Sequence, residues 1–261
     1  MQERHINRKK YFNEQIQTTS RFVVPFIQKY KNINSSARVL EIGCGEGGNL
    51  KPFIDLSCEC IGVDLSSNKI ELGKQFFSEF ESAKTPHLIV QDIYETNPDD
   101  FGKFDIIIMR DVIEHIHHQE KFMAFVKQFL KDDGLFFLGF PPWQNPFGGH
   151  QQVCRNKFLS VFPYFHLLPK VMYKSVLKLL GETDNTIEAL LEIKQTGISL
   201  ERFERILKNE NYAIVEKTFF LFNPNYEVKF GLKPRKQLAI VSAIPFVRNF
   251  FTTAAYYLIK K

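Results

Sequence analysis

Cysteine is scarce in this sequence, and the patterns that mark zinc modules and secreted disulfide scaffolds are missing. The four cysteines are Cys44, Cys58, Cys60 and Cys154. The Cys58-x-Cys60 spacing is not that of a common zinc site, so reduced thiols in the core are expected. The N-terminal stretch lacks the apolar run of a secretory signal peptide. We therefore expect a cytoplasmic protein.

A long uninterrupted apolar run is also missing. The segment 238–259 is apolar in composition, but Pro245, Arg248 and Asn249 interrupt it. Because a charge near the middle of a bilayer is costly, this segment predicts no membrane span. The net charge of +5 is small and the basic residues are scattered, so no nucleic-acid partner is expected.

Phenylalanine is what the chain has in excess, with 27 residues of 261. Many of these belong in the core, but their abundance after residue 140 predicts an apolar surface for a small-molecule substrate or a partner. A peripheral, lipid-like substrate fits the same composition. The length and the hydrophobic fraction of 44% suit one α/β domain with an elaboration.

Apolar runs alternate with segments of helical periodicity through the first half of the chain. Five runs have the length and composition of buried strands: 38–42, 59–64, 87–92, 104–109 and 135–140. Asp133-Gly134 predicts a turn before the fifth. Two more strands are expected at 212–222 and 254–259, after an amphipathic helix that begins near Ser199. This order predicts a doubly wound, seven-stranded, mostly parallel α/β sheet with ligands beyond the carboxyl ends of its strands.

The segments around these strands divide the chain. Residues 1–35 predict a mobile arm, ending near residue 10, and then a helix that Pro25 divides or kinks. Residues 36–140 are the predicted ligand-binding core. Residues 141–198 hold no evident strand and predict a helical, aromatic insertion that covers the ligand site. Residues 199–261 add a helix and the last strands to the same domain.

The end of the first strand carries the most informative pattern, Glu41-x-Gly43-x-Gly45-x-Gly47. Glycines there allow positive φ angles and let another molecule approach bare backbone. The pattern resembles the first motif of class I S-adenosylmethionine (SAM) methyltransferases. Gly43-x-Gly45-x-x-Gly48 also matches the NAD(P) fingerprint, and a turn without a ligand is a third interpretation.

Acidic residues at the next strand ends favour SAM. Asp64 ends the second strand, where a carboxylate can accept hydrogen bonds from both ribose hydroxyls. Asp92, followed by Ile93, ends the third strand; in the methyltransferase family this position recognises adenine, whereas NAD enzymes require no acid there. After the fourth strand, Val112-Ile-Glu-His-Ile116 resembles small-molecule methyltransferases of the ubiquinone-biosynthesis O-methyltransferase type. The resemblance covers roughly residues 36–140.

The resemblance implies SAM as the methyl donor, S-adenosylhomocysteine as the product and one set of cofactor contacts. The expected cofactor-binding residues are Tyr11, Glu41, Gly43, Cys44, Gly45, Gly47, Asp64, Leu65, Asp92, Ile93 and Arg110. Arg110 is expected beside the methionine part of the cofactor. The family's amino-methylating motif, Asn/Asp-Pro-Pro-Tyr/Phe, does not follow the fourth strand, which argues against N-methylation of DNA adenine or glutamine.

The acceptor side is expected after the fourth and fifth strands. Glu114 and His115 border the predicted mouth, and His150 has the intrinsic pKa of a general base, so these three are the predicted catalytic residues. The predicted substrate contacts are Trp143, Phe147 and His166. No metal is expected, because His115, His117 and His118 are too close in sequence to face one ion from a helix.

These patterns predict a SAM-dependent methyltransferase of a small, apolar or aromatic acceptor, with O-methylation favoured. Because the sulfonium of SAM is already a strong methyl donor, the protein must mainly align the acceptor with the methyl group and exclude water. Two other interpretations stay open. One is a SAM-binding accessory protein without catalysis, and the other is an NAD-dependent oxidoreductase.

Overall fold

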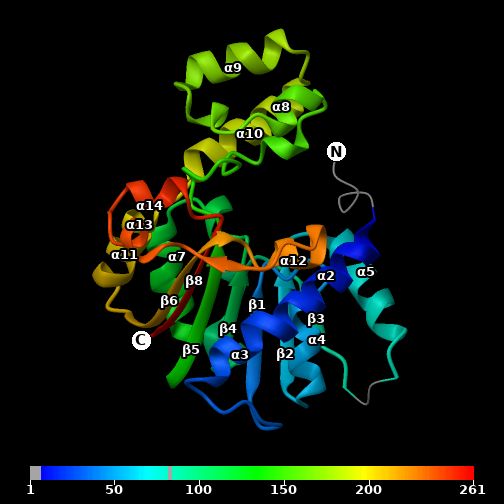
Figure 1. Cartoon of the computed structure of the whole chain (residues 1–261). Helices are drawn as coiled ribbons and strands as arrows, with labels where there is room; N and C mark the ends of the chain where they lie inside the picture. The colour runs from blue at the N-terminus through cyan, green and yellow to red at the C-terminus, as the bar shows by residue number, and fades with distance from the viewer. Residues whose placement is uncertain (1–6, 82–83) are drawn as a thin grey trace.

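The computed structural model describes residues 7–81 and 84–261. In those residues a mixed sheet forms the centre, with strand order β3-β2-β1-β4-β5-β8-β6-β7, and helices cover both of its faces (Figure 1). The strands are β1 (Arg38–Ile42), β2 (Glu59–Asp64), β3 (His87–Val90), β4 (Phe104–Arg110), β5 (Leu130–Phe140), β6 (Ala213–Phe222), β7 (Arg235–Lys236) and β8 (Ala254–Lys260). Neighbours from β3 to β5 are parallel, whereas β8 runs antiparallel to both β5 and β6. The predicted doubly wound, mostly parallel α/β fold is confirmed.

The sheet has one strand more than predicted. All seven expected strands are present among the described residues, and β7 adds an eighth at the edge, where it pairs antiparallel with β6. β7 is two residues long and exposed, so it carries none of the apolar alternation that marks a strand in sequence. The predicted count of seven was therefore wrong.

Strand β5 also differs from the prediction. A turn was expected at Asp133-Gly134, but β5 runs through both residues. Its register against β4 shifts between the pair Phe104–Leu130 and the pair Ile106–Leu135. The extra residues of β5 form a bulge, which absorbs the polar stretch without ending the strand.

Two layers of buried apolar side chains lie on opposite faces of the sheet. Leu40 and Ile42 point into one layer and Val39 into the other, as the two-residue period of a strand requires. Helices α7 (Gln119–Val126) and α11 (Leu200–Asn209) cover the first layer. The second layer is covered by α2 (Arg8–Thr18), α3 (Val24–Gln28), α4 (Lys51–Asp55) and α5 (Ser67–Ser78).

The N-terminal helix begins earlier than expected. Residues 1–6 lie outside the described residues, and α2 starts at Arg8 with the Asn7 side chain accepting from Lys10 N, so the arm does not extend to residue 10. A π turn (Thr19–Val23) separates α2 from α3. Pro25 lies in the first turn of α3, where its missing N–H is not needed. Val23 and Val24 both keep α-region backbone angles, so the helix changes from π to α before Pro25 and is not divided there.

The segment between β5 and α11 is helical. It contains α8 (Lys157–Val161), α9 (Lys170–Leu179) and α10 (Asp184–Thr196), and no strand appears among its described residues. These helices pack around a small apolar cluster of their own. The group stands beyond the carboxyl end of β5 (Figure 1). Its role as a cover over a ligand site, and the division of the chain into the four predicted parts, stay predictions.

The connection from β6 to β8 runs through α12 (Asn225–Phe230), β7, α13 (Ala239–Ser242) and α14 (Val247–Phe250). These helices are short. In the part of the chain that the structure describes, no helix has both the length and the apolar composition that crossing a bilayer would take.

Candidate functional site

The glycine loop leaves β1 with three residues in the left-handed region, of which Gly43 (φ +71°) and Gly45 (φ +56°) come first. Gly43 N donates to Val63 O at 2.8 Å, and a Cβ on Gly43 would lie 2.6 Å from Val112 Cγ2. Gly43 is therefore required by the close approach of the turn after β4. A Cβ on Gly45 would meet only Lys69, at 3.8 Å, so the backbone at Gly45 is open to a ligand.

Asp64, at the end of β2, is tied to this loop. Its Oδ2 accepts from Gly45 N at 2.8 Å and its Oδ1 accepts from Ser66 N at 2.9 Å. A carboxylate oxygen has a second acceptor site, so both oxygens keep capacity for hydroxyl donors. The next residue, Leu65, is 73% exposed. Asp64, at the carboxyl edge of the sheet, thus has the acceptor capacity that the predicted ribose contact requires.

Cys44 contributes to the loop differently from its neighbours. Its side chain is buried, and a Cβ on Gly62 of β2 would lie 2.8 Å from Cys44 Sγ. Burial raises the pKa of the Cys44 thiol, so the sulfur is an uncharged core group. Only the backbone of Cys44 is left to face a ligand. Gly47 (φ +79°) closes the loop before the 3₁₀ turn η2 (Gly48–Leu50).

A buried polar network lies beneath the loop. Asn49 Nδ2 donates to Glu41 Oε1 at 2.6 Å, and Arg110 Nη1 donates to Asn49 Oδ1 at 2.7 Å. Arg110 also donates to Thr19 Oγ1 at 3.0 Å and to Asn225 Oδ1 at 2.8 Å. Burial, opposed by the Asn49 hydrogen bond and by Arg110, raises the pKa of Glu41 to about 8. The network joins β1, β4, the N-terminal helices and α12.

Arg110 and Tyr11, which were predicted to contact the cofactor, line one cleft. The cleft lies among residues of α2, β4 and α12, and its lining is Tyr11, Glu14, Gln15, Asn49, Arg110, Asp111, Asn225 and Lys229. Sequence reasoning missed Thr19, Asn49 and Asn225. The position of Asn49, directly after the glycines, was the available signal for that residue, whereas no motif marked the other two.

The predicted adenine position lies at the end of β3. Asp92 Oδ1 accepts from Tyr94 N at 3.0 Å and caps the short turn η3 (Ile93–Glu95). The Ile93 side chain is buried in the main core. Both residues lie at the same carboxyl edge as Asp64. Their proposed roles toward adenine stay predictions.

The three predicted catalytic residues come together in space. Glu114 and His115 belong to the turn η4 (Ile113–His115) after β4, and His150 lies in the loop after β5. The rings of His115 and His150 meet edge to face with centroids 4.9 Å apart. One nitrogen or oxygen atom from each of the three side chains lies within 4.8 Å of the other two.

The cluster contains a buried acid next to more accessible imidazoles. Burial, with the nearby Asp111 charge, raises the pKa of Glu114 well above its usual value. Neither Glu114 carboxyl oxygen has a hydrogen-bond partner among the described residues. Loss of solvent around the ring is the main cause that lowers the pKa of His115. The spacing of Glu114, His115 and His150 would also suit a divalent cation. His117 is not part of this cluster, because its ring is directed to Glu192 Oε1 at 3.4 Å.

The helical insertion holds this cluster in place. Thr196 Oγ1, at the end of α10, donates to Glu114 O at 2.6 Å. Gln119 Nε2 donates to Ile113 O at 2.9 Å and to Thr196 O at 2.7 Å. The turn after β4 and the last turn of α10 are thereby joined. His150 has a left-handed backbone (φ +54°), which sets the direction of its side chain.

The predicted substrate contacts lie in the insertion, but they differ in exposure. Trp143 and Phe147 are half-buried. His166 is fully buried behind Trp143, with perpendicular rings 4.7 Å apart and 2.8 Å between His166 Nε2 and Trp143 O. Burial lowers the pKa of His166 to about 4, so its neutral ring donates to that carbonyl. This geometry favours a supporting position for His166 over a direct substrate contact.

Comparison with known proteins gives partial sequence matches. An uncharacterised protein of Rickettsia prowazekii (strain Madrid E) is 31% identical over 117 residues, which cover 41% of this chain and 45% of that protein. The ubiquinone biosynthesis O-methyltransferase of Mesorhizobium japonicum is 30% identical over 105 residues, or 39% of each protein. The chain thus spans less than half the length of these relatives.

Similarity at the level of structure extends over the whole chain. The magnesium protoporphyrin IX methyltransferase of Synechocystis PCC 6803, solved with bound S-adenosylhomocysteine, superposes with a TM-score of 0.56 at 14% identity. The match covers 95% of this chain and 83% of that one, and it shows a shared fold. The model of the methyltransferase domain family matches residues 11–162. Because this match covers more than half of the chain, the protein belongs to the methyltransferase domain family.

Proposed function

We propose that the protein is a SAM-dependent methyltransferase of a small, apolar or aromatic acceptor, and that it methylates oxygen. The observation that carries the proposal is the contact between two halves of the site. Val112 packs against Gly43 of the glycine loop, and Glu114 and His115 come two and three residues after Val112. A donor bound on the loop therefore lies next to the histidine pair.

The residues of the glycine side hold the donor. The Asp64 carboxylate accepts from ribose hydroxyls, Asp92 accepts from adenine, and the Arg110 network supports the loop from below. SAM, when bound, supplies an electrophilic methyl group on its sulfonium. The alternative of an NAD-dependent oxidoreductase is not favoured, because the chain belongs to a family in which the glycine loop serves methyl transfer.

The histidine side handles the acceptor proton. His150 would take the proton of an acceptor hydroxyl on an imidazole nitrogen, and with SAM bound the methyl group would pass to that oxygen as its carbon–sulfur bond breaks, leaving S-adenosylhomocysteine. His115 packs against the ring of His150 and limits its orientation. The resemblance to ubiquinone biosynthesis O-methyltransferases supports an oxygen acceptor, because that relative's activity is named in those terms.

The insertion supplies the acceptor wall. Trp143 and Phe147 offer half-buried aromatic surfaces at the carboxyl end of β5, and such surfaces suit flat or apolar acceptors. His166 and Lys194 support Trp143, since Lys194 lies 5.3 Å from the centroid of its ring. The insertion would exclude water from the reacting atoms when the acceptor is bound.

Calorimetric titration tests the donor, and turnover tests the enzyme. We expect SAM and S-adenosylhomocysteine to bind and NAD to give no heat of binding. Methyl transfer from labelled SAM is then measured against a panel of phenols, carboxylic acids, amines and carbon acceptors. Binding without turnover on any acceptor would favour the accessory-protein alternative, and the absence of SAM binding would contradict both.

A further inference from the structure

The segment 237–252, between β7 and β8, has its polar side chains inside and its apolar side chains outside. The buried residues are Gln237, Arg248, Asn249 and Thr252. The exposed large apolar residues are Leu238, Ile240, Ile244, Phe246, Val247, Phe250 and Phe251. This arrangement inverts the usual distribution in a water-soluble surface segment, so the segment is built to meet an apolar medium.

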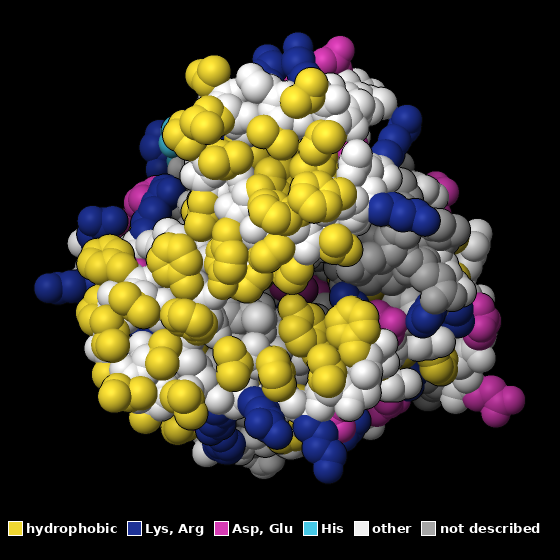
Figure 2. Space-filling view, turned by 45° about the horizontal axis from the view of Figure 1, so that its top comes forward, with side chains coloured by type: hydrophobic (Ala, Val, Ile, Leu, Met, Phe, Trp, Pro, Cys, Tyr) yellow, Lys and Arg dark blue, Asp and Glu magenta, His cyan; other side chains and the backbone are white. Residues whose placement is uncertain are grey.

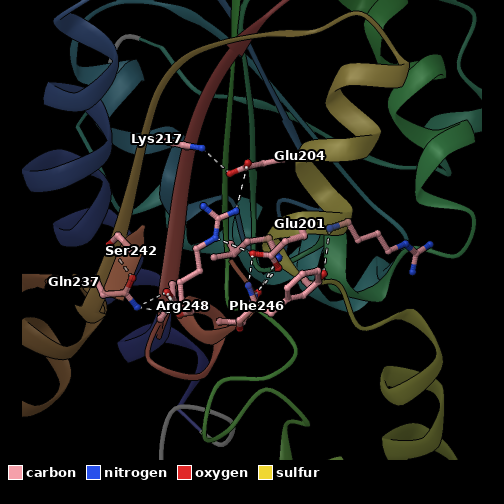
Figure 3. A network of polar contacts seen from close by, with 12 residues as sticks. Glu201, Glu204, Lys217, Gln237, Ser242, Phe246 and Arg248 are labelled. Carbon is pink, nitrogen blue, oxygen red and sulfur yellow. Dashed lines mark hydrogen bonds and ion pairs between the residues drawn. The ribbon is translucent and has the colours of Figure 1, made fainter. Parts of the chain in front are cut away.

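A half-buried acid, Glu201, anchors the segment from below. Glu201 Oε1 accepts from Phe246 N at 2.9 Å and from Arg248 Nε at 2.8 Å, and Glu201 Oε2 accepts from Asn249 Nδ2 at 2.6 Å (Figure 3). Asn249 Oδ1 in turn accepts from Leu200 N at 2.8 Å. The start of α11 and the exposed turn are thereby tied together.

A second set of hydrogen bonds ties the two ends of the segment to each other. Gln237 Nε2 donates to Arg248 O at 2.9 Å and to Thr252 Oγ1 at 2.9 Å. Ser242 Oγ donates to Gln237 Oε1 at 2.8 Å. The polar groups are satisfied inside, and Phe246 (φ +64°) is held in a conformation unusual for a bulky residue. The apolar side chains are therefore fixed outward by the network.

The exposed surface continues onto the insertion. Tyr164 Oη donates to Phe250 O at 3.1 Å, and the two rings are 6.2 Å apart. Beyond Tyr164, exposed large apolar residues of α8 and α9 are Phe158, Val161, Val171, Met172 and Leu179. Figure 2 shows apolar side chains spread over this side of the molecule, with Lys and Arg side chains around them. We call these two sets, from 237–252 and from α8–α9, the apolar face.

The two stretches of sequence that form the apolar face carry no acidic residue. Residues 155–181 and residues 228–261 contain no Asp or Glu. The exposed basic residues in these ranges include Lys157, Lys170, Lys174, Lys178, Lys233, Arg235 and Lys236. An apolar surface with a basic surround is complementary to the interface of an anionic bilayer, where acyl chains meet negative headgroups.

We propose that the apolar face docks on the surface of an anionic phospholipid bilayer, with Ile240, Phe246 and Phe251 entering the headgroup–acyl boundary and the surrounding lysines facing the headgroups. No helix of the described residues crosses the bilayer in this arrangement. Docking places the insertion, which carries Trp143, at the membrane surface. It does not depend on methyl transfer.

Co-sedimentation with vesicles tests the docking. The full-length protein is mixed with vesicles of phosphatidylcholine containing phosphatidylglycerol, and with vesicles of phosphatidylcholine alone. We expect binding to the anionic vesicles and at least about tenfold weaker binding for Ile240→Glu, since an exposed aliphatic side chain that would enter the bilayer is replaced by a charge of the same sign as the headgroups. Ile214→Glu, an identical change on an exposed residue at the far end of β6, is the matched control and should bind like the wild type.

Two further variants separate the apolar contribution to vesicle binding from the electrostatic contribution. Leu179→Glu, at an 85% exposed position of α9, should weaken binding without affecting folding. Lys233→Gln with Lys236→Gln should reduce the preference for anionic vesicles by about fivefold per lysine. Absence of wild-type binding to anionic vesicles, or equal loss in Ile240→Glu and Ile214→Glu, would overturn the proposal. A dimer in light scattering that Ile240→Glu dissociates, without vesicle binding, would overturn it in favour of a self-interface.

Discussion

The imidazole rings of His115 and His150 meet edge to face, with 4.9 Å between their centroids. One ring follows β4 and the other lies in the loop after β5, so no single strand end makes this site. Thr196 of the insertion holds the turn through Glu114 O. The position of the histidine pair therefore depends on the insertion as well as on the sheet.

Replacement of His150 by Ala should slow turnover by about a hundredfold or more while SAM binding is retained. The reason is that His150 is proposed to take the acceptor proton and makes no proposed contact with the donor. Initial rates with the best acceptor, and calorimetry with SAM, measure the two effects separately. His117→Ala, outside the cluster, is the control and should keep its rate. An unchanged rate in His150→Ala would remove His150 from the mechanism.

Replacement of Asp64 by Ala should weaken SAM binding by about ten- to a hundredfold, because hydrogen bonds to a charged group contribute about 1.5–3 kcal/mol each. Part of the loss in affinity comes from the glycine loop, because Asp64 also accepts a hydrogen bond from Gly45 N. Asp64→Asn keeps one acceptor oxygen, so its affinity for SAM should lie between those of the wild type and Asp64→Ala. Glu71→Ala, which removes an exposed acid from α5, controls for net charge. Equal affinity in Asp64→Ala and Glu71→Ala would contradict the ribose role.

The sequence predicted the strands well where local apolar patterning decides them. It failed at β7, whose two exposed residues have no pattern, and at Asp133-Gly134, which lie in a bulge within β5 instead of ending the strand. Likewise, Glu114, His115 and His150 were marked by motif and residue type. Their contact follows from neighbouring strand ends in a parallel sheet, whereas the exact ring geometry does not.

The polar network under the glycine loop was not predictable in the same way. Asn225 and Thr19 come from segments without a motif, and they meet Arg110 only because α2 and α12 pack over the same end of β4. The sequence predicts a substrate contact for His166 from the chemistry of its side chain alone. Its burial behind Trp143 depends on the packing of the insertion, which has no repeating pattern in sequence.

Zinc should inhibit turnover, and a chelator should reverse the inhibition. A zinc ion bound by His115, His150 and Glu114 would occupy the imidazole nitrogens that the proposed proton transfer requires. Dose–response curves for the wild type and for Glu114→Gln measure the effect, and the variant should need more zinc because it lacks one ligand. Turnover that is lost on chelation and restored by a divalent cation would show the reverse, a metal required by the reaction.

His166 should make the stability of the protein depend on pH. Its pKa in the fold is lowered to about 4, against about 6.5 in an unfolded chain. As pH falls, the unfolded chain therefore takes up the proton first, and stability that is complete above about pH 6.5 is lost between about pH 6.5 and pH 4. Between about pH 7 and about pH 5 the wild type should lose about 2 kcal/mol more than His166→Gln, whose amide can still donate to Trp143 O. Urea unfolding at both pH values measures the difference, with the exposed His87→Gln as the control, and equal losses in wild type and His166→Gln would show that the buried ring does not titrate in this range.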